Sequence, residues 1–327
     1  MIRLPSDKKR VVLIGECLIE LSGTPFGPLH QTFGGDSLNT ALYLARLMRH
    51  TIDVKYITVV GTDALSDELV RRWQNEGIDT ALTLRDPGRL PGLYLIQVDA
   101  AGERTFLYWR RESAARFLLQ HPGYRHVATE LATADLIYLS GISLAILPDQ
   151  DRSRLLDQLQ RSAAGGTGIV FDTNYRPALW SSADSAHAAL SMIFPMTRLL
   201  FATYDDEQRL WGDRSPEATL ARLHAANAAC VVIKLGAAGC LFSDGANVTK
   251  IAASPVAMVT DTTAAGDAFN AGFLAAWLED YSPEDCCRAA NALAGAVIQH
   301  RGAIIPASAT PSFAQLMAHR SNAVTAP

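Results

Sequence analysis

The chain has 327 residues, of which 49% are hydrophobic and 19% charged, and its formal net charge is −4 at pH 7. A pI near 6.1 argues against a general nucleic-acid-binding protein, which carries an excess of basic residues. No apolar run approaches the ~18 residues of a membrane span, and the run at 11–14 is too short for the core of a signal peptide. We therefore expect a cytoplasmic protein without a nucleic-acid or membrane partner.

Five cysteines are present, and neither their number nor their spacing favours a structural role. An odd number cannot be fully paired in disulfides, and the spacings fit no zinc pattern. The vicinal pair, Cys286 and Cys287, cannot chelate a tetrahedral metal alone. Reduced thiols are therefore expected at all five positions, which are Cys17, Cys230, Cys240, Cys286 and Cys287.

Short apolar runs alternate with helical patterns along most of the chain. The run at 11–14 has the continuous hydrophobicity of a strand buried on both faces, and the segment 37–48 places Leu38 and Leu42 on one helical stripe. Strands are also predicted at 56–60, 136–139, 168–172, 199–202 and 230–234, and helices at 67–75 and 149–161. This alternation is typical of βαβ units. We predict an α/β fold with a doubly wound, mostly parallel sheet flanked by helices.

One stretch breaks this alternation. The segments 93–98 and 104–109 are both strand-like and are joined by five residues that include a glycine, which predicts a hairpin. The first of these strands is apolar on both faces, so each face has to cover something. We expect a small β-sheet lid, formed by segments of about 16–33 and 89–111 inserted in a single domain that spans 1–327. The second apolar face predicts self-association through the lid, as a dimer or a larger homo-oligomer.

The segment 261–267, Asp-Thr-Thr-Ala-Ala-Gly-Asp, precedes a strongly helical run. Small residues let a ligand approach the backbone, and the unpaired amides of the first helical turn form an anion site together with the helix dipole. In this position Asp267 is suited to accept a proton from a hydroxyl that attacks a phosphorus atom. Its position alone fits an ordinary helix-capping aspartate equally well.

A second segment, 33–39, reads Phe-Gly-Gly-Asp-Ser-Leu-Asn and opens the first helix. Its paired glycines allow close approach to a ligand, and its polar side chains offer hydrogen bonds, although a glycine turn with a helix cap explains the pattern as well. The chain contains no Gly-Lys-Ser or Gly-Lys-Thr, and no Gly-x-Gly-x-x-Gly follows the first strand. Any phosphate site is therefore expected at 261–267.

These two segments together resemble the two signatures of the ribokinase-like (PfkB) sugar kinases. Further segments match the family in the same order, at 61–63, 139–142, 172–177 and 234–239. The resemblance covers roughly residues 11–306. It implies a ribokinase-like fold with a β-lid, and ATP and Mg²⁺ as cofactors.

Within the family, five more segments resemble members that act on 2-dehydro-3-deoxygluconate, at 15–21, 90–94, 102–106, 108–110 and 301–306. This implies ATP-dependent phosphorylation of the primary hydroxyl of 2-dehydro-3-deoxy-D-gluconate to give the 6-phosphate. A kinase of another sugar, such as fructose, is the alternative within the family. A sugar or nucleotide sensor on the same fold is the alternative outside catalysis, and the presence of Asp267 counts against it.

The charge of such a substrate agrees with residues at two places in the chain. Tyr108 and Arg110 are two positions apart in a strand and share one face, and Arg176 follows a strand at the edge where doubly wound sheets bind ligands. Guanidinium groups bind carboxylates through paired hydrogen bonds, which a neutral hexose does not require. Each arginine alone is explained as well by an ion pair with an acidic residue of the protein.

The resemblance also implies roles for individual residues. Asp267 is the expected base, and the amides of Ala264, Ala265 and Gly266 are expected to hold the transferred phosphoryl group. The residues expected to bind the sugar, with Asp267, are Gly34, Gly35, Asp36, Ser37, Asn39, Tyr94, Tyr108, Arg110 and Arg176. Those expected on the nucleotide side, with the amides of the loop, are Asn174, Arg176, Lys234, Gly236, Gly239 and Asn291.

One departure from the family pattern concerns the metal. Many members carry Asn-x-x-Glu after a central strand, a motif tied to the magnesium shell, whereas this chain reads Tyr204-Asp-Asp-Glu207. Mg²⁺ is still expected, because the phosphates need neutralisation, and Glu207 is expected to contact it through water. Asp261 permits a monovalent cation such as K⁺, which many relatives use near this position.

Overall fold

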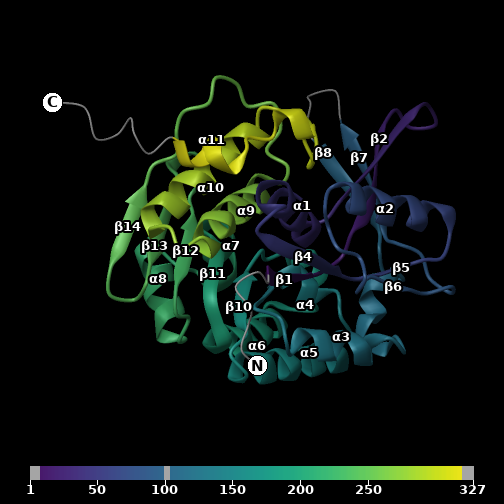
Figure 1. Cartoon of the computed structure of the whole chain (residues 1–327), viewed down its shortest axis with the longest axis horizontal. Coiled ribbons are helices and arrows are strands. Elements are labelled where there is room, and N and C mark those ends of the chain that lie inside the picture. Colours follow the sequence, from purple (N-terminus) through teal and green to yellow (C-terminus); the bar gives the residue numbers. More distant parts are fainter. Residues whose placement is uncertain (1–7, 99–103, 319–327) are drawn as a thin grey trace.

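The computed structural model describes residues 8–98 and 104–318, and its centre is an eight-stranded sheet (Figure 1). Six neighbouring strands run parallel, and β13 and β14 close one edge in antiparallel fashion. In spatial order the strands are β14 (Val248–Ile251), β13 (Cys240–Ser243), β12 (Val231–Lys234), β11 (Thr197–Thr203), β10 (Gly168–Asp172), β9 (Leu136–Ser140), β1 (Lys9–Ile14) and β4 (Ile52–Ile57). The predicted mostly parallel α/β sheet is confirmed.

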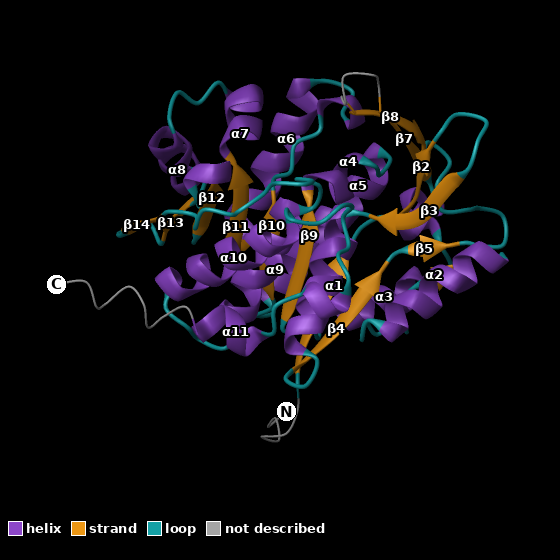
Figure 2. Cartoon of the chain, turned by 90° about the horizontal axis from the view of Figure 1, so that it is seen from above, coloured by secondary structure: helices purple, strands orange, loops and turns teal. Residues whose placement is uncertain are grey.

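Helices cover both faces of this sheet (Figure 2). Successive residues of β1 point to opposite faces, so that Val11 and Leu13 join one hydrophobic core while Val12 and Ile14 join the other. The first core contains residues of α1 (Asp36–Met48), α2 (Ala64–Asn75), α9 (Ala265–Leu278), α10 (Pro283–Val297) and α11 (Phe313–Ala318). The second contains residues of α3 (Tyr124–Leu131), α4 (Gly141–Ala145), α5 (Asp149–Ala164), α6 (Ala183–Ile193), α7 (Tyr204–Trp211) and α8 (Pro216–Ala225).

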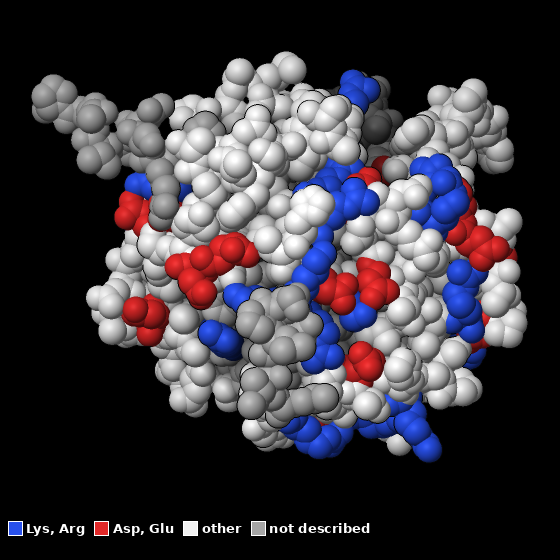
Figure 3. Space-filling model, in the orientation of Figure 1, with Lys and Arg blue, Asp and Glu red and all other residues white. Residues whose placement is uncertain are grey.

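The remaining helical elements are short 3₁₀ segments in the connections. In chain order they are η1 (Ala114–Gln120), η2 (Pro177–Leu179), η3 (Phe194–Met196), η4 (Gly236–Ala238) and η5 (Ala307–Ala309). In the part of the chain that the structure describes, no helix combines the length and the apolar composition that crossing a bilayer requires. Acidic and basic side chains are interspersed on the face seen in Figure 3.

Three predicted elements differ clearly from the structure. The helix predicted at 149–161 extends three residues further, to Ala164. The strand predicted at 56–60 is wrong as one element: β4 ends at Ile57, and β5 (Val59–Val60) pairs instead with β6 (Leu84–Arg85) in a separate two-stranded sheet. The helix predicted at 67–75 begins three residues earlier. Asp63 caps it, because the Asp63 side chain accepts hydrogen bonds from the backbone amides of Leu65 and Ser66.

The predicted small second sheet is present and has four strands, in the order β3 (Leu29–Gly34), β2 (Leu18–Gly23), β7 (Leu93–Val98) and β8 (Arg104–Trp109). Both strands of the predicted hairpin have the expected bounds, and their five-residue connection lies outside the described residues. On β7 the side chain of Tyr94 is buried. On the edge strand β8 four successive large side chains are exposed, namely Phe106 (39%), Leu107 (37%), Tyr108 (53%) and Trp109 (59%).

The order of the parallel strands determines where a ligand can bind. From β1 the chain crosses to β4 on one side, and it later returns to β9 on the other side of β1. Crevices at the carboxyl ends of the strands, next to such a reversal, are the usual ligand sites of doubly wound sheets. Here the amino termini of α1 and α9 and the second sheet border the same region (Figure 1).

Candidate active site

Two cavities meet at the carboxyl edge of the main sheet. One has a volume of about 680 Å³ and is lined by many charged side chains, and we call it the polar cavity. The other has a volume of about 550 Å³ and is lined mainly by apolar side chains, and we call it the apolar cavity. Both are bordered by Lys234, Thr262, Ala265 and Gly266. Ligands in the two cavities would therefore meet at the amino terminus of α9.

The loop before α9 is held in a shape that exposes backbone amides. Ala264 caps the helix in the left-handed region, with φ of 59°. The amide of Ala265 donates to the Thr262 carbonyl at 3.2 Å, while the amides of Ala264 and Gly266 make no hydrogen bond within the described chain. Asp261 braces the loop, since its carboxylate accepts hydrogen bonds from the Thr263 amide and hydroxyl and from the Gly302 amide. The loop is thus an anion site at a helix amino terminus.

Asp267 lies in the first turn of α9 and lines the polar cavity. Its Oδ2 accepts a hydrogen bond of 2.8 Å from the Asn39 side-chain amide. The pKa of Asp267 is raised from 3.8 to about 7, mainly by burial and next by the negative charge of Asp36, while the hydrogen bond from Asn39 opposes the shift. A carboxyl group with a pKa near neutrality is suited to act as a general base at physiological pH.

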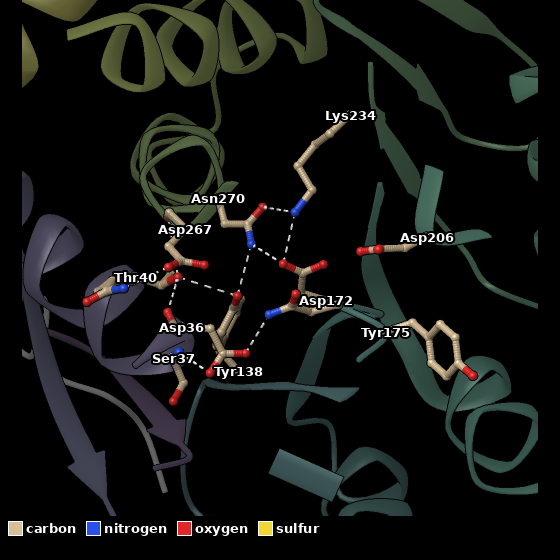
Figure 4. A network of polar contacts seen from close by, with 12 residues as sticks. Asp36, Ser37, Thr40, Tyr138, Asp172, Tyr175, Asp206, Lys234, Asp267 and Asn270 are labelled. Carbon is tan, nitrogen blue, oxygen red and sulfur yellow. Dashed lines mark hydrogen bonds and ion pairs between the residues drawn. The ribbon is translucent and has the colours of Figure 1, made fainter. Parts of the chain in front are cut away.

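A network of polar side chains forms the floor between the cavities (Figure 4). Asp172 Oδ2 accepts hydrogen bonds from Lys234 Nζ at 2.9 Å and from Asn270 Nδ2 at 2.7 Å. Asn270 also donates to Tyr138 Oη at 3.0 Å and accepts from Lys234 at 3.3 Å. These contacts connect β9, β10 and β12 to α9. They hold the Lys234 ammonium beside the anion loop, where a Cβ at Gly266 would lie 3.4 Å from Nζ.

Most residues expected to bind the sugar line the polar cavity. These are Gly34, Gly35, Asp36, Asn39, Tyr94, Tyr108, Arg110, Arg176 and Asp267. Gly35 is required there, because a Cβ at this position would lie 2.1 Å from the Glu16 carbonyl oxygen. Ser37 does not line the cavity: it is fully buried, and its hydroxyl contacts Tyr56 Oη at 3.1 Å.

Both arginines of the polar cavity are paired with acidic residues of the protein. Arg110 pairs with the buried Glu16, which also accepts a hydrogen bond from Ser113. Arg176 Nη1 lies 3.0 Å from Asp206 Oδ2. Each arginine therefore forms the ion pair with an acidic residue of the protein that was the alternative to binding a substrate carboxylate. A guanidinium has five N–H donors, and Arg110 Nε is buried without a hydrogen-bond partner among the described residues.

The residues expected on the nucleotide side divide between the cavities. Lys234, Gly236, Gly239 and Asn291 line the apolar cavity together with Val256, Val259, Phe269 and Ile298. Asn174 and Arg176 line the polar cavity instead, and Asn174 Nδ2 donates to Asp36 Oδ2 at 2.7 Å. Gly239 has φ of 94°, and a Cβ there would lie 2.0 Å from the Ile251 carbonyl oxygen, so only glycine fits.

Glu207, expected to reach a metal through water, is fully buried and is not among the residues that line the polar cavity. It forms an ion pair of 2.6 Å with Arg222, which also pairs with Asp213. Burial raises the pKa of Glu207, an effect that Arg222 opposes. The hydroxyl of Tyr204 approaches the Asp213 carbonyl at 3.4 Å, so this part of α7 is occupied by protein contacts.

The polar cavity nevertheless offers oxygen atoms of the kind that Mg²⁺ prefers. Asp172 and Asp206 line it, and Asp172 Oδ1 is buried without a hydrogen-bond partner in the described part of the chain. Within that same part, no group of three or more His, Cys, Asp or Glu is arranged to hold a metal. The residues therefore fit a Mg²⁺ ion that takes most of its ligands from phosphates and water.

Sequence reasoning assigned no role to Glu16, Asp172, Asp205, Asp206 or Asn270, although four of them line the polar cavity. Asp172 lies in the segment 172–177, which resembles the family, but it was given no role of its own. The signal that identifies the acidic ones is their position, because they lie at or shortly after the carboxyl ends of β1, β10 and β11.

A doubly wound sheet with an anion loop between two cavities, and an aspartate of pKa near 7 beside it, has the arrangement of a phosphoryl-transfer enzyme. Comparison with known families agrees with this class. The model of the pfkB family of carbohydrate kinases matches residues 8–310, and the chain belongs to that family. Kinases of this family use ATP with Mg²⁺.

Curated relatives and solved structures extend the comparison. The chain is 49% identical over 300 residues to the 2-dehydro-3-deoxygluconokinase of Haemophilus influenzae, covering 91% of this chain and 96% of the relative. It is 44% identical to the enzyme of the same name from Escherichia coli K12, covering 93% and 99%. The crystal structure of fructokinase with bound ATP from Xylella fastidiosa superposes with a TM-score of 0.81 at 21% identity, covering 95% and 98%.

Proposed function

We propose that this chain is a 2-dehydro-3-deoxygluconokinase, which transfers a phosphoryl group from ATP to the primary hydroxyl of 2-dehydro-3-deoxy-D-gluconate and forms the 6-phosphate. The activity of the relatives from Haemophilus influenzae and Escherichia coli supports this substrate. The structural observation that carries the proposal is a single cavity that contains Asp267 beside the anion loop together with Arg110 and Arg176.

In the proposed reaction, Asp267 accepts the proton of the attacking hydroxyl, so that the oxygen attacks the γ-phosphorus as its negative charge develops. The free amides of Ala264 and Gly266 donate hydrogen bonds to the transferring group, and Lys234 adds a positive charge nearby. Mg²⁺, when bound, neutralises charge on the phosphates. The nucleotide base occupies the apolar cavity, where Asn291 is one of the polar side chains in the wall.

The sugar acid occupies the polar cavity with its carboxylate toward the arginines. Arg110 retains its contact with Glu16 through Nη2 and uses guanidinium N–H groups outside that contact, while Arg176 is half-exposed and can reorient. Binding therefore adds a second anionic partner to guanidinium groups that the protein already holds in place.

The test is an assay of ADP release by the purified chain with Mg²⁺ and ATP against 2-dehydro-3-deoxygluconate, related sugar acids, fructose and ribose. We expect kcat/KM to be highest for 2-dehydro-3-deoxygluconate. Faster turnover of fructose would contradict the substrate assignment and favour a kinase of another sugar. That alternative has some support, because both arginines already form ion pairs with acidic residues of the protein. Binding without turnover of any compound would favour a sensor.

We further propose that two copies associate through the second sheet. The exposed Leu107 and Trp109 on β8 support this, because they lie on the strand face opposite to Phe106 and Tyr108, which line the polar cavity, and large apolar side chains are costly to leave in water. Light scattering is expected to show a dimer or a larger assembly, and Leu107→Glu is expected to shift it toward the monomer. A monomeric wild-type chain at high micromolar concentration would refute the contact.

A further inference from the structure

The polar cavity carries more negative than positive charge, although a phosphorylated nucleotide and a sugar acid are both anions. Its walls include six carboxylates but only three cationic side chains, which are Arg110, Arg176 and Lys234. The acidic residues are Glu16, Asp36, Asp172, Asp205, Asp206 and Asp267. Such an excess of negative charge repels anionic ligands, so a cation has to enter with them.

Among the carboxylates that line the polar cavity, one buried oxygen has no hydrogen-bond partner in the described part of the chain. Asp172 is 2% exposed, and its Oδ2 is engaged by Lys234 and Asn270, whereas Oδ1 has no hydrogen-bond partner in the described residues. A buried carboxylate oxygen without a partner is unfavourable unless water or a cation binds there. Because two donors hold Oδ2, the direction of Oδ1 is fixed.

A second carboxylate faces this oxygen. Asp206 lies in the first turn of α7, directly after β11, and Figure 4 shows its carboxylate pointing toward Asp172 across the polar cavity. Arg176 engages Asp206 Oδ2 from one side. The two carboxylates lie on neighbouring parallel strands or just beyond them, on the same floor as Lys234 and close to the anion loop.

The glutamate that the family pattern ties to the magnesium shell is not available in the same way. Glu207 is fully buried and its Oε2 is held by Arg222 at 2.6 Å; its Oε1 also has no hydrogen-bond partner among the described residues, but the residue does not line the polar cavity. The Asn position of that pattern is Tyr204, whose hydroxyl contacts Gln208 and Asp213.

We infer that Asp172 and Asp206, rather than Glu207, supply the protein carboxylates for the divalent cation that enters with the nucleotide. The inference rests on the proposed function for its choice of nucleotide. Two carboxylates alone form an incomplete site for a hard cation, so phosphate oxygens must complete it. The metal is therefore expected to bind weakly to the free protein and tightly when a nucleoside diphosphate is present.

The experiment is a titration with Mn²⁺, followed by the electron paramagnetic resonance signal of the free ion, with and without saturating ADP and in the absence of sugar. Asp172→Asn and Asp206→Asn are each expected to weaken Mn²⁺ binding to the ADP complex by about 10- to 100-fold. Asp205→Asn is the matched control. It removes the same charge from an exposed neighbour on the same cavity wall, and less than about a twofold change is expected.

Circular dichroism establishes that each variant is folded, and Asp206→Asn carries the test if the buried Asp172→Asn fails to fold. Glu207→Gln, if folded, is expected to bind Mn²⁺ like the wild type. The inference is overturned if the folded Asp172 and Asp206 variants bind Mn²⁺ as tightly as the wild type, or if Asp205→Asn weakens binding equally. A wild type that binds Mn²⁺ with ADP but does not phosphorylate 2-dehydro-3-deoxygluconate would refute only the proposed function.

Discussion

The two cavities that meet at the amino terminus of α9 are built in different ways. In the polar cavity the charged groups are already in contact with one another, as in the pairs Arg110–Glu16 and Arg176–Asp206. In the apolar cavity small and apolar residues leave open space, and Gly239 is required by the backbone itself. A ligand in the polar cavity therefore binds to guanidinium groups that are already ion-paired, whereas a ligand in the apolar cavity fills a preformed space.

This difference separates the expected effects of mutations. Changes in the polar cavity should be large and should depend on pH, because they alter partly buried charged groups that interact with one another. Changes in the apolar cavity should be small and independent of pH, because they remove neutral contacts. The predictions below test this contrast.

The largest effect is expected for Asp267→Asn. An asparagine can still accept the hydrogen bond of Asn39, but it cannot accept the proton of the attacking hydroxyl. We expect kcat to fall by about 10²- to 10⁴-fold, the range usual for loss of a general base. Binding of the sugar acid, measured by calorimetry, should remain. A variant that retains half of the wild-type activity would contradict the assigned role.

The pH dependence of the wild type should follow the same residue. The pKa of Asp267 is about 7, and only the ionised form accepts a proton. Measured kcat/KM for the sugar acid should therefore fall about tenfold for each pH unit below 7. A profile that stays flat down to pH 5 would show that Asp267 ionises at an ordinary pKa or is not the base.

The raised pKa also makes a prediction about stability. Because the pKa of Asp267 in the folded chain lies above the unfolded value of 3.8, the folded state favours the protonated form. The contribution of this residue to stability is present below pH 3.8 and is lost as the pH rises through 7. Asp267→Asn should therefore raise Tm relative to the wild type at pH 8, and the difference should shrink toward pH 4. An equal Tm difference at both values would contradict the shift.

The arginines come next in size. Arg110→Ala and Arg176→Ala should each raise KM for the sugar acid by about 10- to 100-fold, the value of a hydrogen bond between charged groups. Removal of Arg110 leaves Glu16 buried without its cation. The thermal stability of the Arg110→Ala variant must therefore be compared with that of the wild type. Arg176 is half-exposed and provides the cleaner test. An unchanged KM for the acid in Arg176→Ala would place the substrate carboxylate elsewhere.

The contrast also explains which features could be predicted from the sequence. The hairpin strands at 93–98 and 104–109 follow from local hydrophobic patterns, and the loop at 261–267 follows from small residues before a helix. The contacts of charged side chains are not local, since Arg110 and Glu16 are 94 residues apart and Asn174 and Asp36 are 138 apart. Their pairing depends on the order of strands in the sheet.

The position of Glu207 illustrates the same limit. Its match to the glutamate of the Asn-x-x-Glu pattern, which the family resemblance ties to the magnesium shell, suggested a contact with the metal. In the structure the side chain points to the interior, toward Arg222 of the following helix. The direction of a side chain in a first turn depends on how the helix packs, which spacing along the chain does not determine.

The smallest effect is expected in the apolar cavity, from Asn291→Ala. The Asn291 amide makes only long contacts, at 3.4 Å to the Ala252 carbonyl and 3.9 Å to Cys240 Sγ, so little of the fold depends on it. Loss of one neutral hydrogen bond to the nucleotide should raise KM for ATP about fivefold, with kcat and the pH profile unchanged. A lower kcat or a shifted pH profile would show that the two cavities are coupled through Lys234, which borders both of them. The contrast between a charged cavity and a neutral one would then be wrong.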